Sequence, residues 1–241
     1  MGIMESGWRL TRRFYMETSP KIIALIPAYN ESEHIVSVVT GVRRHLPVLV
    51  VDDGSQDDTA ALAESAGASV LRQTPNQGKG AALLNGFKRC LDEGCDAVVH
   101  LDGDGQHDPE EIPLFLEAYA RTGAALVIGR RDFSKMPQPR ATTNTIGRWM
   151  FSAAVGQDIP DNQSGYRLVT RPLLELLVQD TSEAGFEFEV DMITRCLKHR
   201  LGLVWVPIRT IYAGEKSHIR YAHHVVHYFR IVNKARRQMR K

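Results

Sequence analysis

Residues 21–55, KIIALIPAYNESEHIVSVVTGVRRHLPVLVVDDGS, contain the pattern that decides the fold. Five apolar residues, 22–26, are closed by Pro27 and predict a strand that is buried on both faces. Apolar residues at helical spacing predict a helix over 32–45, and a second buried strand follows at 48–51. A strand, a helix and a second strand in this order indicate a right-handed crossover between parallel strands.

The same alternation continues through the first half of the chain. Further elements of this kind are expected as helices at 58–66 and 80–91 and strands at 68–71 and 97–101. Beyond Gly129 the alternation weakens, and the expected elements are helices at 142–155, 172–178 and 187–198 and strands at 166–169 and 203–206. We therefore expect an α/β fold with a mostly parallel central sheet flanked by helices. Ligands of such sheets bind at the carboxyl ends of the strands.

The composition is that of one globular domain. The chain has 241 residues, of which 43% are hydrophobic and 24% charged, and this excludes a disordered or fibrous protein. The formal net charge of +2 is unevenly distributed, because residues 216–241 contain eight lysines and arginines and no acidic residue. Residues 1–215 carry 22 basic and 28 acidic residues. We divide the chain into a lead (1–20), a main domain (21–215) and a basic tail (216–241).

The sequence carries no sign of an integral membrane protein or of a secreted one. Its three cysteines lack the paired spacing of a disulfide framework or a zinc site, so a reducing cytoplasm is the expected location. No apolar stretch approaches the roughly 18 to 20 residues that span a bilayer, and residues 1–20 lack the apolar core of a signal peptide.

The basic tail predicts an amphipathic helix. Apolar residues on one face of this helix are those at positions 219, 222, 225, 226, 229 and 232. This face could dock on the main domain, or it could lie in a membrane interface with the basic face toward anionic lipids. Basic tails also suit nucleic acid, but the acidic body and the lack of a recognition motif argue against a nucleic-acid-binding module.

An acidic cluster follows the predicted strand at 97–101. Gly103 allows the chain to turn between Asp102 and Asp104, so that both carboxylates can face one point, and Gln106 follows. Oxygen ligands of this kind suit Mg²⁺ or Mn²⁺, although acidic turns also occur without a metal. No basic residue stands close by in sequence, so we expect a metal to offset the repulsion between the carboxylates.

Other candidate ligand-binding residues follow the first strands. Asp52 and Asp53 could accept hydrogen bonds from a ribose or a base, or they could cap the next helix. Tyr29 offers an aromatic face for a base, and the glycine-flanked Lys79 offers a cation and backbone N–H groups for a phosphate. A classical dehydrogenase is disfavoured, because Leu83 occupies the last glycine position of the dinucleotide fingerprint.

Five short motifs occur in the order seen in family 2 glycosyltransferases. They are IPAYNE at 26–31, VDDGS at 51–55, QGKG at 77–80, LDGDGQ at 101–106 and QSGYR at 163–167. From about Lys21 to the tail, the sequence most resembles the branch with dolichyl- and polyprenyl-phosphate mannosyl- or glucosyltransferases. The resemblance implies a GT-A fold and inverting transfer of a hexose from a GDP- or UDP-sugar to a polyprenyl or dolichyl phosphate. A soluble catalytic domain would then act at the cytoplasmic face of a membrane as a peripheral protein.

The resemblance also implies roles for individual residues. The residues that would hold the donor include the candidates above. They are Pro27, Ala28, Tyr29, Glu31, Asp52, Asp53, Lys79, Asp102 and Gly103. The metal, Mg²⁺ or Mn²⁺, would be held by Asp102, Asp104 and Gln106. The acceptor phosphate would be bound by Arg131, Arg140 and, from a loop at 214–218, Lys216. Catalysis would depend on Asp104, Arg131 and Arg140.

Several alternatives stay open. Transfer to a sugar hydroxyl would need a general base, for which Glu187, Glu189 and Asp191 are the candidates. Asp161 and the 164–167 turn could form the acceptor side of the site or could be structural. A nucleotidyltransferase would also need a metal at a strand end, but its glycine-rich, basic signature is missing near the first strand.

Overall fold

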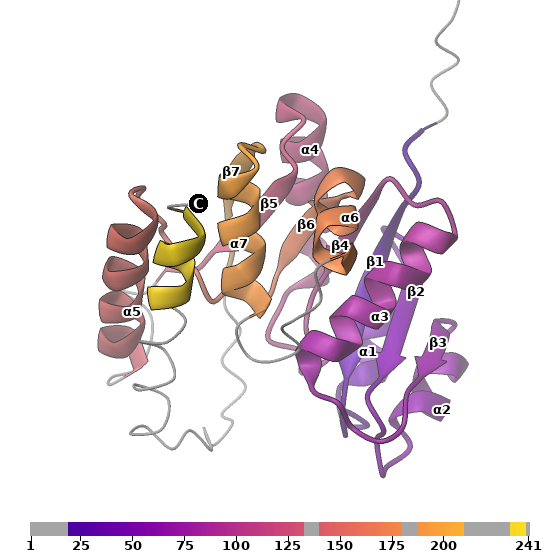
Figure 1. Ribbon diagram of the computed structural model, residues 1–241. Helices are drawn as coiled ribbons and strands as arrows, with labels where there is room; N and C mark the ends of the chain where they lie inside the picture. The colour runs from indigo at the N-terminus through magenta and orange to yellow at the C-terminus, as the bar shows by residue number, and fades with distance from the viewer. Residues whose placement is uncertain (1–18, 133–139, 180–187, 210–231, 240–241) are drawn as a thin grey trace, which may run out of the picture.

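A computed structural model describes residues 19–132, 140–179, 188–209 and 232–239. A seven-stranded sheet with the order β3-β2-β1-β4-β6-β5-β7 lies at its centre (Figure 1). The strands are β1 (Ile22–Ala28), β2 (Val48–Asp52), β3 (Ser69–Arg72), β4 (Ala97–His100), β5 (Leu126–Arg130), β6 (Arg167–Thr170) and β7 (Leu203–Pro207). Only β6 pairs antiparallel with its neighbours, β4 and β5, among the described pairs. The expected mostly parallel sheet is confirmed.

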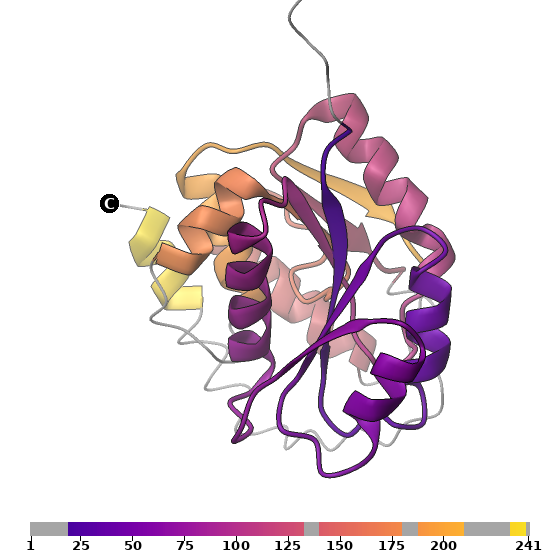
Figure 2. The same cartoon turned by 90° about the vertical axis from the view of Figure 1, so that its right-hand side faces the viewer.

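Helices cover both faces of the sheet. They are α1 (Ile35–Val42), α2 (Thr59–Ser65), α3 (Lys79–Asp92), η1 (Pro109–Glu111), α4 (Ile112–Thr122), α5 (Arg140–Val155), α6 (Arg171–Gln179), α7 (Phe188–Lys198) and a helix at 232–239. Figure 2 shows α3, α6 and α7 on one face and α1, α2 and α4 on the other. Each layer has its own core: Leu25 of β1 packs in the first, and Ala24 and Ile26 pack in the second. Because the strands are buried on both faces, they are continuously apolar.

Besides the short η1, the sequence analysis did not predict α4 and β5 between residues 101 and 142. Both leave a signal in the sequence. Ile112, Phe115 and Ala118 lie at helical spacing and are buried, and the run that forms β5 is apolar from Leu126 to Ile128. The alternation of helices and strands therefore continues further along the chain than we expected.

The sheet has its topological switch point between β1 and β4. The chain runs from β1 through α1 to β2 on one side, whereas β4 pairs with β1 on the other side. Ligands of open α/β sheets bind in the crevice outside the carboxyl ends at such a point. Because β6 is the one reversed strand in the described part of the sheet, β5 and β7 also end at this edge.

The described part of the basic tail packs on the body. In the helix at 232–239, Val232 is 9% exposed and Ala235 is 2% exposed, and Ala235 belongs to the same core as Phe151 of α5. Arg236 and Arg237 are exposed. Of the two interpretations of the tail, docking therefore holds for this segment, and residues 216–231 lie outside the described residues.

The contact between α3 and β1 leaves no room for a side chain at Gly86. A Cβ atom there would lie 2.5 Å from Leu25 Cδ1 in the core. The Gly86→Ala variant is expected to lower the free energy of unfolding by about 1–2 kcal/mol, since overpacking outweighs the gain in helix propensity. Urea denaturation measures this change.

The matched control is Lys88→Ala, an exposed position two residues along the same helix. It should change the free energy of unfolding by no more than about 0.5 kcal/mol. An equal effect of the two variants would show that α3 does not pack against β1 this closely.

Candidate active site

The loops after β1 and β2 form one hydrogen-bonded unit. The Asn30 N–H donates to Ser55 Oγ at 2.9 Å, and the Gln56 N–H donates to Asn30 Oδ1 at 2.8 Å. The Glu31 N–H donates to Thr59 Oγ1 at 2.8 Å. Asn30 has a positive φ of 56°, which turns the chain within the loop after β1. The IPAYNE and VDDGS motifs are thus held together at the carboxyl edge of the sheet.

The predicted donor residues of β1 and its loop lie at this edge. Pro27 and Ala28 end β1, and the Tyr29 side chain beyond them is 43% exposed, so its ring is accessible to a planar ligand. Glu31 lies beside the acidic cluster, because a Cβ atom at Gly103 would be 3.4 Å from Glu31 Cγ. The fold therefore brings the first and fourth motifs together.

The Asp53 carboxylate is bound within the protein, whereas the sequence analysis had offered it to a ribose or a base. It is 3% exposed, and its carboxylate accepts hydrogen bonds from the N–H groups of Gln77 at 2.8 Å and Gly78 at 2.7 Å, and from the Gln73 side chain. Of the backbone N–H groups at the start of α3 that we expected to offer to a phosphate, that of Gly78 is therefore bound to Asp53. Its neighbour Asp52 is 5% exposed at the end of β2, so a donor contact by either carboxylate stays a prediction.

The acidic cluster has a basic partner that the sequence analysis missed. Lys79 Nζ lies 2.6 Å from Asp102 Oδ1 and 3.1 Å from Glu189 Oε1. Burial alone would lower the pKa of Lys79, but the two carboxylates outweigh it and raise this pKa above its usual value. Burial likewise opposes ionisation of Asp102, yet Lys79 keeps its pKa well below the ordinary value. The Lys79 and Asp102 pair is therefore ionised near neutral pH, and the protein itself supplies one positive charge at the acidic cluster.

The QSGYR motif packs directly on this ion pair. A Cβ atom at Gly165 would lie 2.8 Å from Asp102 Oδ2 and 3.0 Å from Lys79 Nζ, so only glycine fits without displacing them. The next residue, Tyr166, is fully buried and stacks on Phe115 with ring centroids 4.3 Å apart. The fifth motif thus forms the wall behind the acidic cluster.

The donor set at the end of β4 fits a divalent cation. Asp102 and Asp104 are carboxylates in one turn, and the Gln106 side chain adds an amide oxygen. The Gln106 N–H donates to Asp104 Oδ1 at 2.9 Å, which tightens the turn. Within the described residues no group of three or more His, Cys, Asp or Glu is placed to hold a metal. Mg²⁺ and Mn²⁺ suit such a partial set, because phosphate oxygens and water complete their coordination.

His107 supports this turn as a neutral side chain. Its Nδ1 atom accepts the Asp102 N–H at 3.1 Å, so in the neutral ring the proton is on Nε2. Burial lowers the pKa of His107 to about 4, although the nearby Asp102 works in the opposite direction. His107 therefore fixes the backbone of Asp102 without adding charge to the site.

Arg131 is held in a buried, bidentate ion pair. Its Nε and Nη2 atoms lie 2.7 Å and 2.9 Å from the two carboxylate oxygens of Asp161, which is fully buried. Asp161 also accepts the N–H groups of Gln163 and Ser164, both at 3.1 Å. The pair joins the end of β5 to the loop that carries the fifth motif, so Asp161 has a structural role whether or not Arg131 also contacts a ligand.

The fully buried Arg167 ties the same loop to α7. It donates hydrogen bonds to the carbonyl oxygens of Ser164 at 2.7 Å, Asn162 at 3.3 Å and Glu189. Burial lowers the pKa of Arg167 to about 10, which leaves it cationic at neutral pH. The structural interpretation of the 164–167 turn therefore holds for Arg167.

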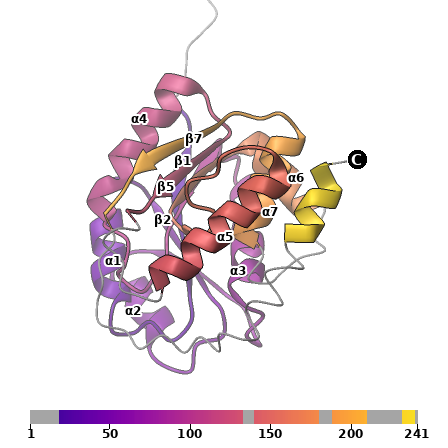
Figure 3. The ribbon, with the colours of Figure 1, turned by 90° about the vertical axis from the view of Figure 1, so that its left-hand side faces the viewer.

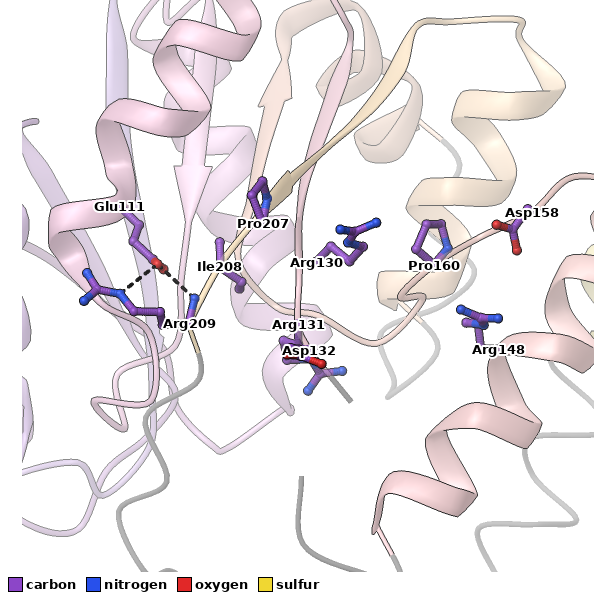
Figure 4. A pocket seen from close by; sticks show the side chains of 10 residues that line it. All are labelled: Glu111, Arg130, Arg131, Asp132, Arg148, Asp158, Pro160, Pro207, Ile208 and Arg209. Carbon is purple, nitrogen blue, oxygen red and sulfur yellow. Dashed lines mark hydrogen bonds and ion pairs between the residues drawn. The ribbon is translucent and has the colours of Figure 1, made fainter. Parts of the chain in front are cut away.

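A pocket of about 600 Å³ opens beyond Arg131, at the carboxyl ends of β5 and β7 (Figure 4). Its lining includes four arginines from three parts of the chain, namely Arg130, Arg131, Arg148 and Arg209, and three acidic residues, Glu111, Asp132 and Asp158. Glu111 accepts the Arg209 N–H at 2.9 Å. A lining of this kind, with more basic than acidic groups, suits an anionic ligand.

Of the four pocket arginines, the sequence analysis had singled out Arg131 and did not name Arg130, Arg148 or Arg209. Arg209 follows the end of β7 by two residues, as the other site residues follow their strands, and that position was its signal. Arg148 lies within α5, and nothing in the sequence relates it to β5. The predicted Arg140 is the first residue of α5. The predicted Lys216 and its 214–218 loop lie outside the described residues.

Two of the three candidate bases are engaged with cations. Glu189 pairs with Lys79, as described above. Asp191 Oδ2 lies 2.6 Å from Arg195 Nε, and both side chains are largely buried. Glu187 lies outside the described residues. The described part of the chain therefore offers no carboxylate of this set that faces the pocket without a basic partner.

A sheet that brings an acidic turn and a basic pocket to one carboxyl edge is typical of the GT-A fold of nucleotide-sugar transferases. The sequence profile described as "Glycosyl transferase family 2" matches residues 23–177, and the chain belongs to this family. The expected family and fold are thus confirmed.

The similar proteins include a monophosphomannose synthase and a mannosyltransferase. The "Polyprenol monophosphomannose synthase" of Mycolicibacterium smegmatis is 34% identical over 207 residues, which cover 78% of this chain and 76% of that protein. The "Undecaprenyl-phosphate mannosyltransferase" of Micrococcus luteus is 36% identical over 202 residues, with 78% and 82% covered. A crystal structure of glucosyl-3-phosphoglycerate synthase from Mycobacterium tuberculosis, in complex with UDP, has a TM-score of 0.72 at 20% identity and covers 90% of this chain and 80% of its own. Another structure of that enzyme holds Mn²⁺, UDP and glucosyl-3-phosphoglycerate.

The buried pair of Asp161 and Arg131 allows a direct test. Asp161→Asn should lower the free energy of unfolding by about 3 kcal/mol, because it leaves a nearly buried guanidinium without its counter-charge. Thermal or urea unfolding measures the change. Asp158→Asn, on an exposed carboxylate that lines the same pocket, is the control and should change stability by about 0.5 kcal/mol or less. Comparable losses in both variants would contradict a structural role for this pair.

Proposed function

We propose that the protein transfers a hexose from a GDP- or UDP-sugar to a polyprenyl or dolichyl phosphate, with inversion at the anomeric carbon. The observation that carries this proposal is the arginine-lined pocket, which opens at the same sheet edge as the acidic cluster at the end of β4. A donor diphosphate and an acceptor phosphate would then lie side by side. The names of the similar mannosyltransferases support a lipid phosphate as acceptor.

On the donor side, the joined loops after β1 and β2 would bind the nucleotide, with the exposed ring of Tyr29 against the base. Asp102, Asp104 and Gln106 would hold Mg²⁺ or Mn²⁺. When bound, this cation neutralises the charge that develops on the departing nucleoside diphosphate. Lys79, which is 39% exposed beside Asp102, adds a second positive charge that the protein itself provides.

On the acceptor side, Arg131 and Arg140 would hold the lipid phosphate. One phosphate oxygen forms a bond to C1 of the sugar while the bond from C1 to the diphosphate oxygen breaks, and its electron pair leaves with the nucleoside diphosphate. Attack from the face opposite the leaving group inverts C1, so the protein mainly has to align two bound substrates. The phosphate oxygen is already anionic near neutral pH, so no general base is required. The ion pairs of Glu189 with Lys79 and of Asp191 with Arg195 support a reaction without a general base.

The acceptor also suggests where the protein works. A polyprenyl phosphate is anchored in a bilayer, and nucleotide sugars are soluble. We therefore place the reaction at the cytoplasmic face of a membrane, with the protein bound peripherally.

Sugar transfer from GDP-mannose, UDP-glucose and related donors to undecaprenyl phosphate, followed by mass spectrometry, tests the proposal. Asp104→Asn should lower kcat/KM on the order of 100-fold or more, because a group that stabilises the leaving diphosphate is lost. Glu64→Gln, on an exposed carboxylate of α2, should leave the rate unchanged. Absence of any glycosylated lipid phosphate from the wild-type protein with all donors would refute the proposed function.

The nature of the acceptor can be separated from the family assignment. Glu189→Gln should reduce kcat less than tenfold, whereas loss of a true general base costs about 10²–10⁴-fold. Arg140→Ala should reduce kcat/KM for the lipid phosphate by about 10- to 100-fold through loss of a charged hydrogen bond. The reverse pattern, measured with the same transfer assay, would favour a sugar hydroxyl as acceptor.

A further inference from the structure

Helix α5 is apolar on its outer side as well as its inner side. Its inner row, Gly147, Phe151 and Val155, is buried. Its outer row contains Ile146, which is 55% exposed, and Trp149, which is 70% exposed. The helix on the surface of a globular protein is normally polar on the side that faces water. The outer row of α5 therefore has the composition of a contact surface.

The position of α5 leaves this row accessible. In Figure 3, α5 lies in front of the sheet, and no described element covers it. The other exposed large apolar side chains of the described residues are dispersed over the molecule. Tyr29 lies in the loop after β1, Val36 on α1 and Leu114 on α4. Among the helices that the structure describes, only α5 presents two such side chains one helical turn apart.

The charges of α5 indicate the kind of partner. The helix contains arginines and no acidic residue. Arg148, which is adjacent to Trp149 in sequence, lines the arginine-rich pocket. The helix at 232–239 packs in the same core as the inner row of α5 and exposes Arg236 and Arg237. Tryptophan beside arginine on an amphipathic helix is typical of segments that lie in a membrane interface and attract anionic lipids.

The length of α5 excludes the role of a membrane span. Its 16 residues give about 24 Å of helix, which is shorter than a hydrocarbon core of about 30 Å. None of the helices in the described ranges is long and apolar enough to cross a bilayer. A contact of α5 with a membrane would therefore lie along the surface.

We propose that the outer row of α5, centred on Trp149 and Ile146, docks the protein on the interface of a membrane that contains anionic lipids. This contact sets the arginine-lined pocket at the level of the lipid phosphates, because Arg148 and Trp149 are adjacent on one helix. The inference rests on the proposed function for its purpose, but the docking surface itself is independent of the reaction. It differs from the prediction for the tail, whose described apolar residues Val232 and Ala235 pack on the body.

Flotation of the full-length protein with vesicles of phosphatidylcholine and phosphatidylglycerol, without acceptor, tests the docking surface. Trp149→Ala should lower the partition coefficient on the order of tenfold, because less apolar surface is buried in the membrane. The double variant with Ile146→Ala should lower it further for the same reason. Leu114→Ala removes a 40% exposed apolar side chain from α4 and should bind like the wild type. Circular dichroism and melting temperature should be unchanged in all three variants, because these side chains are exposed.

A spectroscopic measurement places the contact on Trp149 itself. Trp149→Phe should retain vesicle binding, because phenylalanine is also apolar, but should lose most of the fluorescence quenching that brominated lipids cause in the wild type. Quenching that persists in Trp149→Phe would overturn the inference. Unchanged vesicle binding of the Trp149→Ala, Ile146→Ala double variant would also overturn it.

The transfer assay distinguishes this inference from the proposed function. With a short, water-soluble polyprenyl phosphate, Trp149→Ala should turn over like the wild type, and with the long-chain acceptor in vesicles it should lose activity in proportion to binding. A wild-type protein that docks through Trp149 but transfers no sugar would refute the proposed function and still support the docking surface. Sedimentation velocity that shows dimers dependent on Trp149, without vesicle binding, would assign this face to a second copy of the chain and overturn the inference.

Discussion

The ion cluster of Lys79, Asp102 and Glu189 is the interaction on which the site depends. It joins three segments that are far apart in sequence: the start of α3, the turn after β4 and the first turn of α7. Gly165 of the fifth motif lies so close that a Cβ atom there would be 2.8 Å from Asp102 Oδ2. Two carboxylates in a partly buried site would repel one another, and the ammonium group offsets this repulsion in the protein alone. Lys79 thus holds the Asp102 carboxylate in its ionised form without any added ligand.

A second buried ion pair organises the other half of the site. Arg131 and Asp161 join the end of β5 to the loop before β6, and the backbone N–H groups of that loop complete the hydrogen bonding of the carboxylate. A fully buried carboxylate is tolerated only with such partners. Because the reversed strand β6 lies between β4 and β5, the acidic cluster and the arginine pocket are separated along one edge. Under the proposed function, this separation would give the donor diphosphate and the acceptor phosphate separate places.

The sequence predicted much of the fold for a definite reason. Buried parallel strands are continuous apolar runs, and helices between them show their own period, so β1, β2, β4 and α3 were found nearly to the residue. The motifs after these strands were correctly expected at one edge, since parallel strands share an edge by topology. The missed elements α4 and β5 carried the same signals. The apolar pattern of residues 112–130 was therefore sufficient to predict both elements.

Partners across the fold were beyond the sequence. Nothing in the spacing of residues relates Lys79 to Glu189, or Arg148 and Arg209 to Arg131, because these contacts depend on how helices pack on the sheet. The same holds for Trp149, whose exposure on α5 is a property of packing and not of the local pattern. The sequence by itself determined the mostly parallel sheet, the family and which polar side chains follow the strands, because strand period and short motifs are properties of the linear sequence. Only the tertiary structure decided which charges neutralise one another and which apolar side chains remain at the surface, because both follow from contacts between distant segments.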